Sequence, residues 1–117
     1  MNPKEMQERT KAFGLRVIRL EATLPRTAVA KVIGGQLLRC GTSVGANYRA
    51  ACRAKSTADF VAKMGTVEEE ADESLYWMEL LIDAGLVPAE QLTALMKEGD
   101  EILAIVVTSI RTARQRK

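Results

Sequence analysis

The sequence has no histidine among its 117 residues. Histidine supplies the nitrogen ligands of ferritin-like di-metal bundles and of many zinc sites. It is also the base in Ser-His-Asp and Cys-His catalytic groups. The sequence therefore excludes those metal centres and those nucleophilic enzymes, and it predicts no catalytic residue, no metal and no cofactor.

Cysteines and long apolar runs are also scarce. The two cysteines, Cys40 and Cys52, lie on one predicted helix roughly 18 Å apart, which is too far for a disulfide. The longest apolar stretch near the C-terminus, residues 102–107, is far too short to span a bilayer. With no signal-peptide pattern, the chain is expected to be cytoplasmic and to have no membrane partner.

Aromatic residues make up only 4% of the chain, whereas apolar residues in total make up 47%. A core of Leu, Ile, Val, Ala and Met favours packed helices over a sheet, which would need β-branched and aromatic runs. The length fits one domain with its own core. The net charge of +2 is too small to indicate a nucleic-acid partner by itself, so the distribution of charge matters more.

Apolar residues recur at helical spacing in four segments. Helices are predicted over residues 3–24, 27–54, 58–84 and 88–115. Pro25 is expected to end the first helix, and Pro88 to open the fourth at its first position. Ser56 or Thr57 is expected to cap the third helix, and Gly85 to follow its end. Because short connections make consecutive helices antiparallel, the sequence predicts an all-α fold, a single antiparallel up-down-up-down four-helix bundle over 1–117.

The apolar stripes also predict which residues form the core. In the second helix they are Ile33, Leu37, Val44, Tyr48 and Ala51. In the fourth helix they are Leu92, Leu95, Met96, Leu103, Val106 and Ile110.

The second helix is unusually rich in small residues. Its glycines, each costing about 1 kcal/mol relative to Ala in a helix interior, are Gly34, Gly35, Gly41 and Gly45. Small residues let another backbone approach closely, either inside one bundle or at a contact with a neighbouring subunit. The second interpretation is preferred, and its candidate interface residues on this helix are Gly41, Ser43, Gly45 and Asn47.

The stretch EEEADES, residues 68–74, contains five carboxylates. Glu69, Glu70 and Glu73 match the Glu-Glu-x-x-Glu motif with which all-α nucleoside triphosphate pyrophosphatases hold Mg²⁺. The second half of that motif is poor, because only Glu98 and Glu101 are available on the following helix. A Mg²⁺-dependent pyrophosphatase is therefore the alternative function, and the short motif arises easily by chance.

A helical projection gives a different interpretation of the same carboxylates. It places Glu69, Glu70 and Glu73 opposite the core stripe. A second flank carries Glu68, Asp72, Glu79 and Asp83, while the second helix gathers Lys31, Arg39, Arg49 and Arg53 on one face. Exposed pairs contribute only about 0–1 kcal/mol each but fix register and partner choice. The sequence thus predicts a role in register and assembly, within the subunit or across an interface.

Trp77, the only tryptophan, falls on the Glu70 and Glu73 side of its helix. It is either an anchor at a subunit interface or the filler of a groove near a helix end. Both interpretations stay open, and the candidate interface residues on this helix are Glu70, Glu73 and Trp77.

The C-terminal segment RTARQRK is basic. Cations at a helix end complement the macrodipole, which is the favoured interpretation. The alternative is a tail that contacts phosphate.

Residues 36–81 resemble the four-helix bundle family of 23S rRNA intervening sequence proteins. The matches to Gln-Leu-x-Arg and Thr-Ser-Val-x-Ala-Asn are Gln36, Leu37, Arg39, Thr42, Ser43, Val44, Ala46 and Asn47. The matches to Ser-x-x-Asp-Phe and to a Glu-rich stretch ending in an aromatic are Ser56, Asp59, Phe60, Glu69, Glu70, Glu73, Ser74 and Trp77. The chain departs from the family at Ala50, where members often carry Glu.

The resemblance implies a ring-like homo-oligomer, with a pentamer as the assembly it suggests, and no enzymatic activity. Some members are encoded within insertions in bacterial large-subunit rRNA genes. Relatives include a ring-forming accessory protein of diversity-generating retroelements, which binds nucleic acid and a reverse transcriptase. The expected function is therefore a non-enzymatic binding or scaffolding protein whose partners are itself and RNA, DNA or a reverse transcriptase. The candidate phosphate contacts are Arg16, Arg19, Arg39, Arg49, Arg53, Arg111, Arg114, Arg116 and Lys117.

Overall fold

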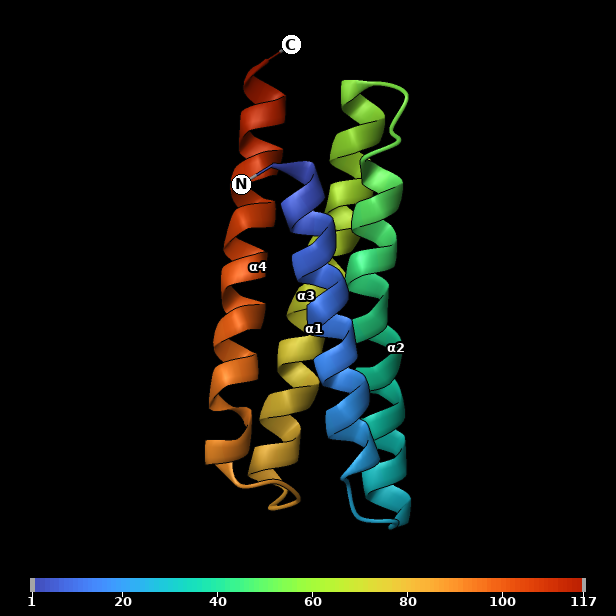
Figure 1. Cartoon of the computed structure of the whole chain (residues 1–117), viewed down its shortest axis with the longest axis vertical. Coiled ribbons are helices and arrows are strands. Elements are labelled where there is room, and N and C mark those ends of the chain that lie inside the picture. Colours follow the sequence, from blue (N-terminus) through green and yellow to red (C-terminus); the bar gives the residue numbers. More distant parts are fainter. Residues whose placement is uncertain (1, 117) are drawn as a thin grey trace.

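The computed structural model describes residues 2–116 and contains four helices (Figure 1). They are α1 (Pro3–Ala22), α2 (Ala28–Ala51), α3 (Thr57–Asp83) and α4 (Ala89–Gln115). The predicted all-α, four-helix fold is confirmed. Figure 1 shows consecutive helices running in opposite directions along an elongated body of 49 × 21 × 21 Å.

The helix starts are fixed by short polar side chains. Asn2, Thr27 and Ser56 each accept a hydrogen bond from the backbone N–H three residues later, which satisfies one of the orphan donors of the first turn. Of the two candidate caps for α3, the structure selects Ser56. The fourth start differs from the prediction, because Pro88 is the N-cap residue and makes no side-chain capping bond.

Two helix ends also differ from the sequence prediction. α1 ends at Ala22, before Pro25, and α2 ends at Ala51, where residues up to 54 were expected. The end of α3 agrees with expectation. Gly85 has a φ of +72°, a left-handed conformation that glycine adopts without steric cost.

The core follows the predicted stripes, with corrections in α4. Leu37, Val44 and Val106 are fully buried, as expected. In α4 Ile102 is buried, whereas the predicted Met96 and Leu103 are only half-buried. Position 102 lies one turn below Val106 on the same face, so the stripe passes through it. No helix in the described part of the chain combines the length and apolarity that a bilayer crossing requires.

Two glycines of α2 let α1 approach closely. A Cβ atom built on Gly41 would lie 2.8 Å and 2.9 Å from the two methyl groups of Val17 on α1, and one on Gly45 would lie 3.3 Å from backbone atoms of Thr10. These two glycines therefore serve the α1–α2 contact inside the chain. This corrects the preference for a subunit interface at Gly41 and Gly45, because α1 occupies the space over them.

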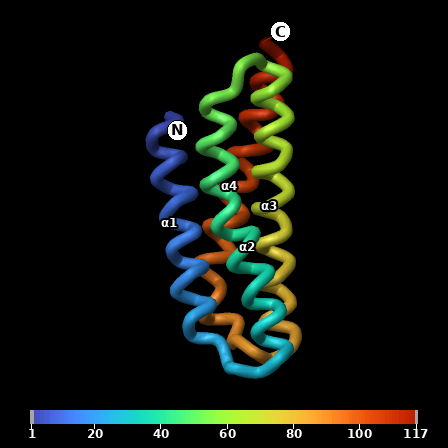
Figure 2. The backbone as a smooth tube through the Cα atoms, turned by 90° about the vertical axis from the view of Figure 1, so that its right-hand side faces the viewer, coloured from blue at the N-terminus to red at the C-terminus, as the bar shows by residue number. Residues whose placement is uncertain are grey.

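The helices are not spaced evenly around the bundle. α2 packs extensively against both α1 and α3, and α3 packs against α4, but α1 and α4 touch much less. Figure 2 shows α1 at the edge of the bundle, beside α2 and away from α3. The seam between α1 and α4 is therefore the weakly closed side.

Alanine substitution at two glycines of α2 tests the close α1–α2 contact. Gly41→Ala should lower the free energy of unfolding by about 1–3 kcal/mol, because Val17 is fully buried and stiff at χ1. Gly35, where an added Cβ atom would meet nothing within 4 Å, is the matched control. Gly35→Ala should raise stability by about 0.5–1 kcal/mol. Urea unfolding measures both, and a stabilised Gly41→Ala protein would contradict the contact.

Candidate interaction surfaces

Arg39 of α2 holds two carboxylates of α3. Its guanidinium donates to Glu73 and lies 3.4 Å from Glu70, and the indole Nε1 of Trp77 also donates to Glu73, at 3.0 Å. We refer to Arg39, Glu70, Glu73 and Trp77 as the Arg39 cluster. The predicted pairing of the basic face of α2 with the acidic side of α3 is thus formed within the chain, at this one arginine.

The contacts of the Arg39 cluster stabilise the ionised states of Glu73 and Arg39. The Trp77 N–H and the Arg39 guanidinium lower the pKa of Glu73 below its usual value. The hydrogen bond to Glu73 in turn raises the pKa of Arg39. Because this guanidinium is already shared between two carboxylates, we remove Arg39 from the set of candidate phosphate contacts.

The predicted interface residues Ser43 and Asn47 lie one and two turns beyond Arg39 on α2. The Ser43 hydroxyl donates to the backbone carbonyl of Arg39, and the Asn47 amide donates to the carbonyl of Ser43. Trp77 is half-buried against the core and stacks edge-to-face with the exposed ring of Tyr76. Its indole is therefore already packed and hydrogen-bonded inside the chain.

The carboxylates of α3 divide differently from the sequence projection. Glu69 lies with Glu68 and Asp72 along a groove towards α4, where Leu103 forms part of the opposite wall. Glu70 and Glu73 face α2 instead. The helical projection had grouped Glu69 with that pair, but Glu69 is exposed beside the groove towards α4 and has no part in the ion pairs of Arg39.

The pyrophosphatase motif is consequently not assembled. Glu70 and Glu73 are engaged by Arg39, and the second half of the motif, Glu98 and Glu101, is engaged by Arg9. Among residues 2–116, no three His, Cys, Asp or Glu side chains lie in an arrangement that could hold a metal ion.

Arg9 of α1 binds two carboxylates of α4, a contact that the sequence reasoning missed. Its Nε and Nη2 each lie 2.7 Å from an oxygen of Glu98, and Nη2 lies 2.6 Å from Glu101. These bonds, chiefly the one to Glu98, raise the pKa of Arg9. The spacing of Glu98 and Glu101 places both on one helix face, but only the adjacency of α1 and α4 shows which cation they meet. We refer to these three residues as the Arg9 cluster.

Five of the predicted phosphate contacts lie towards one end of the bundle, where α2 and α4 both end (Figure 1). They are Arg49, Arg53, Arg111, Arg114 and Arg116, and we call this region the basic end. All five are exposed, and none pairs with a carboxylate within residues 2–116. Arg16 and Arg19 lie apart from them, in the second half of α1. Lys117 lies outside the described residues.

Comparisons with known proteins identify similar chains. The model of the family described as 23S rRNA-intervening sequence protein matches residues 4–108. A crystal structure of a protein with unknown function from the S23 ribosomal protein family of Bacteroides thetaiotaomicron is similar in fold, with a TM-score of 0.87. That protein is 33% identical, and the match covers 95% of this chain and 99% of the other. A comparison with curated proteins finds no match.

Removing the Arg9 cation tests whether its cluster holds the weakly closed seam. Arg9→Met should lower the free energy of unfolding by about 1–2 kcal/mol, because the contacts to the half-buried Glu98 and the exposed Glu101 are lost while the aliphatic stem is kept. Arg19→Met is the matched control on the same helix, and it should change stability by less than about 0.5 kcal/mol. Thermal and urea unfolding measure both. Equal stabilities of the two variants would show that the Arg9 cluster contributes nothing to the seam.

Proposed function

Because the chain belongs to the 23S rRNA-intervening sequence protein family, we propose that it is a self-associating, non-enzymatic bundle that binds nucleic acid. The observation that supports this most is the segregation of charge over the surface. α2 contains three basic residues and no acidic one, whereas α3 contains eight acidic residues and one basic one. A surface divided in this way suits partners of both signs of charge.

The acidic partner surface is the outer side of α3, with Glu68, Glu69, Asp72, Glu79 and Asp83, which we call the acidic face. The complementary surface is formed by α1 and α2, where Arg19 and Lys31 are exposed. Large apolar side chains are exposed on the same two helices, namely Leu15, Ile18, Val29 and Val32. A contact between two different surfaces of identical chains generates a ring when the rotation closes. The proposed assembly is such a ring, and the family resemblance suggests five subunits.

The nucleic-acid surface is the basic end. Unpaired arginines bind phosphate through charge-assisted hydrogen bonds, and this binding depends strongly on salt and little on sequence. The proposed absence of catalysis is supported by the engagement of Glu70, Glu73, Glu98 and Glu101 with arginines, which leaves the predicted Mg²⁺ motif unformed.

Charge reversal on α3 tests the self-association. The double variant Glu69→Lys/Asp72→Lys should lower the molar mass measured by light scattering at low salt, because it opposes like charges across the proposed contact. The control Glu90→Lys/Asp100→Lys makes the same charge change on α4 and should keep the wild-type mass. A monomeric wild-type protein at all concentrations would refute the self-association.

Charge removal at the basic end tests the nucleic-acid binding. Arg111→Gln/Arg114→Gln should weaken binding about tenfold at low salt, since two phosphate contacts are lost. The slope of the logarithm of the binding constant against the logarithm of the salt concentration should fall in magnitude by about two. The control Arg26→Gln/Lys97→Gln removes two exposed cations far from this end and should have little effect. Gel-shift titrations at two salt concentrations measure both. No shift even at low salt would leave only a protein-partner role.

A further inference from the structure

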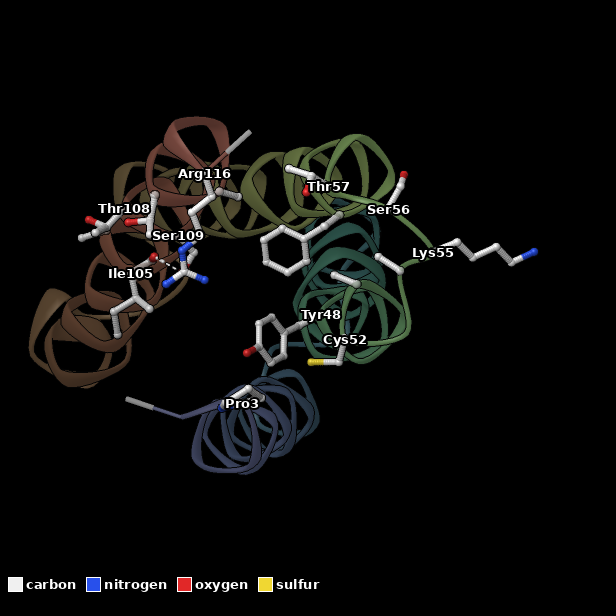
Figure 3. Close-up of a pocket in the computed structure, with 16 residues that line it drawn as sticks. Pro3, Tyr48, Cys52, Lys55, Ser56, Thr57, Ile105, Thr108, Ser109 and Arg116 are labelled. Atoms are coloured by element: carbon white, nitrogen blue, oxygen red, sulfur yellow. Dashed lines mark hydrogen bonds between the residues drawn. The ribbon is translucent and has the colours of Figure 1, made fainter.

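A cleft lies at the basic end, where α4 extends beyond α1. α1 has 20 residues and α4 has 27, and the Arg9 cluster joins the two helices well before α4 ends. The space beyond it is a cleft of about 1030 Å³. Figure 3 shows side chains from all four helices around it, among them Pro3 of α1, Tyr48 of α2 and Ser109 of α4.

The inner surface of the cleft is aromatic and aliphatic. Tyr48 of α2 and Phe60 of α3 line it together with Ala51 and Ile105. Figure 3 shows the Tyr48 ring and its hydroxyl directed into the cleft. A phenol is neutral near pH 7 and does not repel an anion, and burial raises the pKa of Tyr48 further, to about 12.

The charge of the cleft favours an anionic occupant. None of its 16 lining residues is Asp or Glu. Figure 3 shows the Arg116 side chain pointing into the cleft, whereas Lys55 extends away from it. Arg111 and Arg114 precede Arg116 in the last turns of α4. Neither of them lines the cleft, so the basic end meets the cleft at Arg116.

We propose that this cleft binds an unpaired nucleotide of a single strand, with its base against Tyr48 and Phe60 and an adjoining phosphate at Arg116. Aromatic side chains stack on unpaired bases regardless of their identity, and arginine binds the backbone. A duplex keeps its bases stacked inside and presents none to such a site. The inference rests on the proposed function, because it specifies which form of nucleic acid the basic end selects.

Three variants of the full chain distinguish the contribution of the cleft to binding from that of the surrounding charge. Ser109→Trp fills the cleft from α4, Phe60→Leu removes a ring at similar volume, and Arg116→Gln removes the cation. Thr93→Trp places the same indole on an exposed position in the first turns of α4 and is the matched control. Circular dichroism and thermal unfolding establish that each variant is folded.

The measurement compares a short single-stranded RNA carrying 2-aminopurine with a blunt duplex of the same sequence. Wild-type protein should prefer the single strand and change its 2-aminopurine fluorescence. Ser109→Trp and Phe60→Leu should weaken single-strand binding about tenfold while leaving duplex binding within about twofold. Arg116→Gln, at an exposed helix end, should weaken binding of the single strand more than binding of the duplex. Thr93→Trp should bind both forms as the wild type does.

The possible failures are distinguishable. If the wild type binds nucleic acid but the cleft variants leave single-strand binding unchanged, or weaken both forms equally, the cleft proposal is overturned and the proposed function stands. If the wild type binds neither form, both are overturned. If an acidic peptide binds more tightly than the single strand and Ser109→Trp abolishes its binding, the cleft belongs to a protein partner and the nucleotide proposal is overturned.

Discussion

The close approach of α1 to α2 is the contact on which the shape of this bundle depends. Gly41 and Gly45 bring the two helices together at Val17 and Thr10, while the other side of α2 packs on α3. α2 therefore packs against both α1 and α3. Because α1 lies against α2, it makes little contact with α4. Because protein interiors are close-packed, side chains cannot expand to close the wider gap between α1 and α4. The Arg9 cluster links α1 and α4 across this seam, and the cleft lies beyond the cluster.

Two arginines also organise the charge of the surface. Arg39 and Arg9 each take two carboxylates, so most of the potential Mg²⁺ ligands are hydrogen-bonded inside the chain. Half-exposed pairs of this kind contribute little to stability, but they fix the register of neighbouring helices. Among the charges left unpaired within residues 2–116, five carboxylates lie on the acidic face of α3 and five arginines lie at the basic end. The proposed self-association and nucleic-acid binding both follow from this separation.

The family relationship establishes the fold, and the surface geometry supports the proposed function. The chain matches a family model over 4–108 and shares its fold with a structure from the S23 ribosomal protein family whose function is unknown. Fold alone does not assign activity, because function depends on the site. The functional proposal therefore rests on the surfaces. An aromatic cleft without carboxylates lies at the basic end, and the acidic face lies along α3.

Local features of the sequence determined the four helices, the glycine that follows α3 at Gly85 and most of the core, because hydrophobic periodicity and capping act over a few residues. The family was also evident, from motifs spread over residues 36–81. Only the tertiary structure decided how those helices meet. It assigned Gly41 and Gly45 to α1, separated Glu69 from Glu70, and joined Arg9 to Glu98 across 89 positions of sequence. Such contacts depend on the rotation and spacing of whole helices, which the residues of one helix do not fix by themselves.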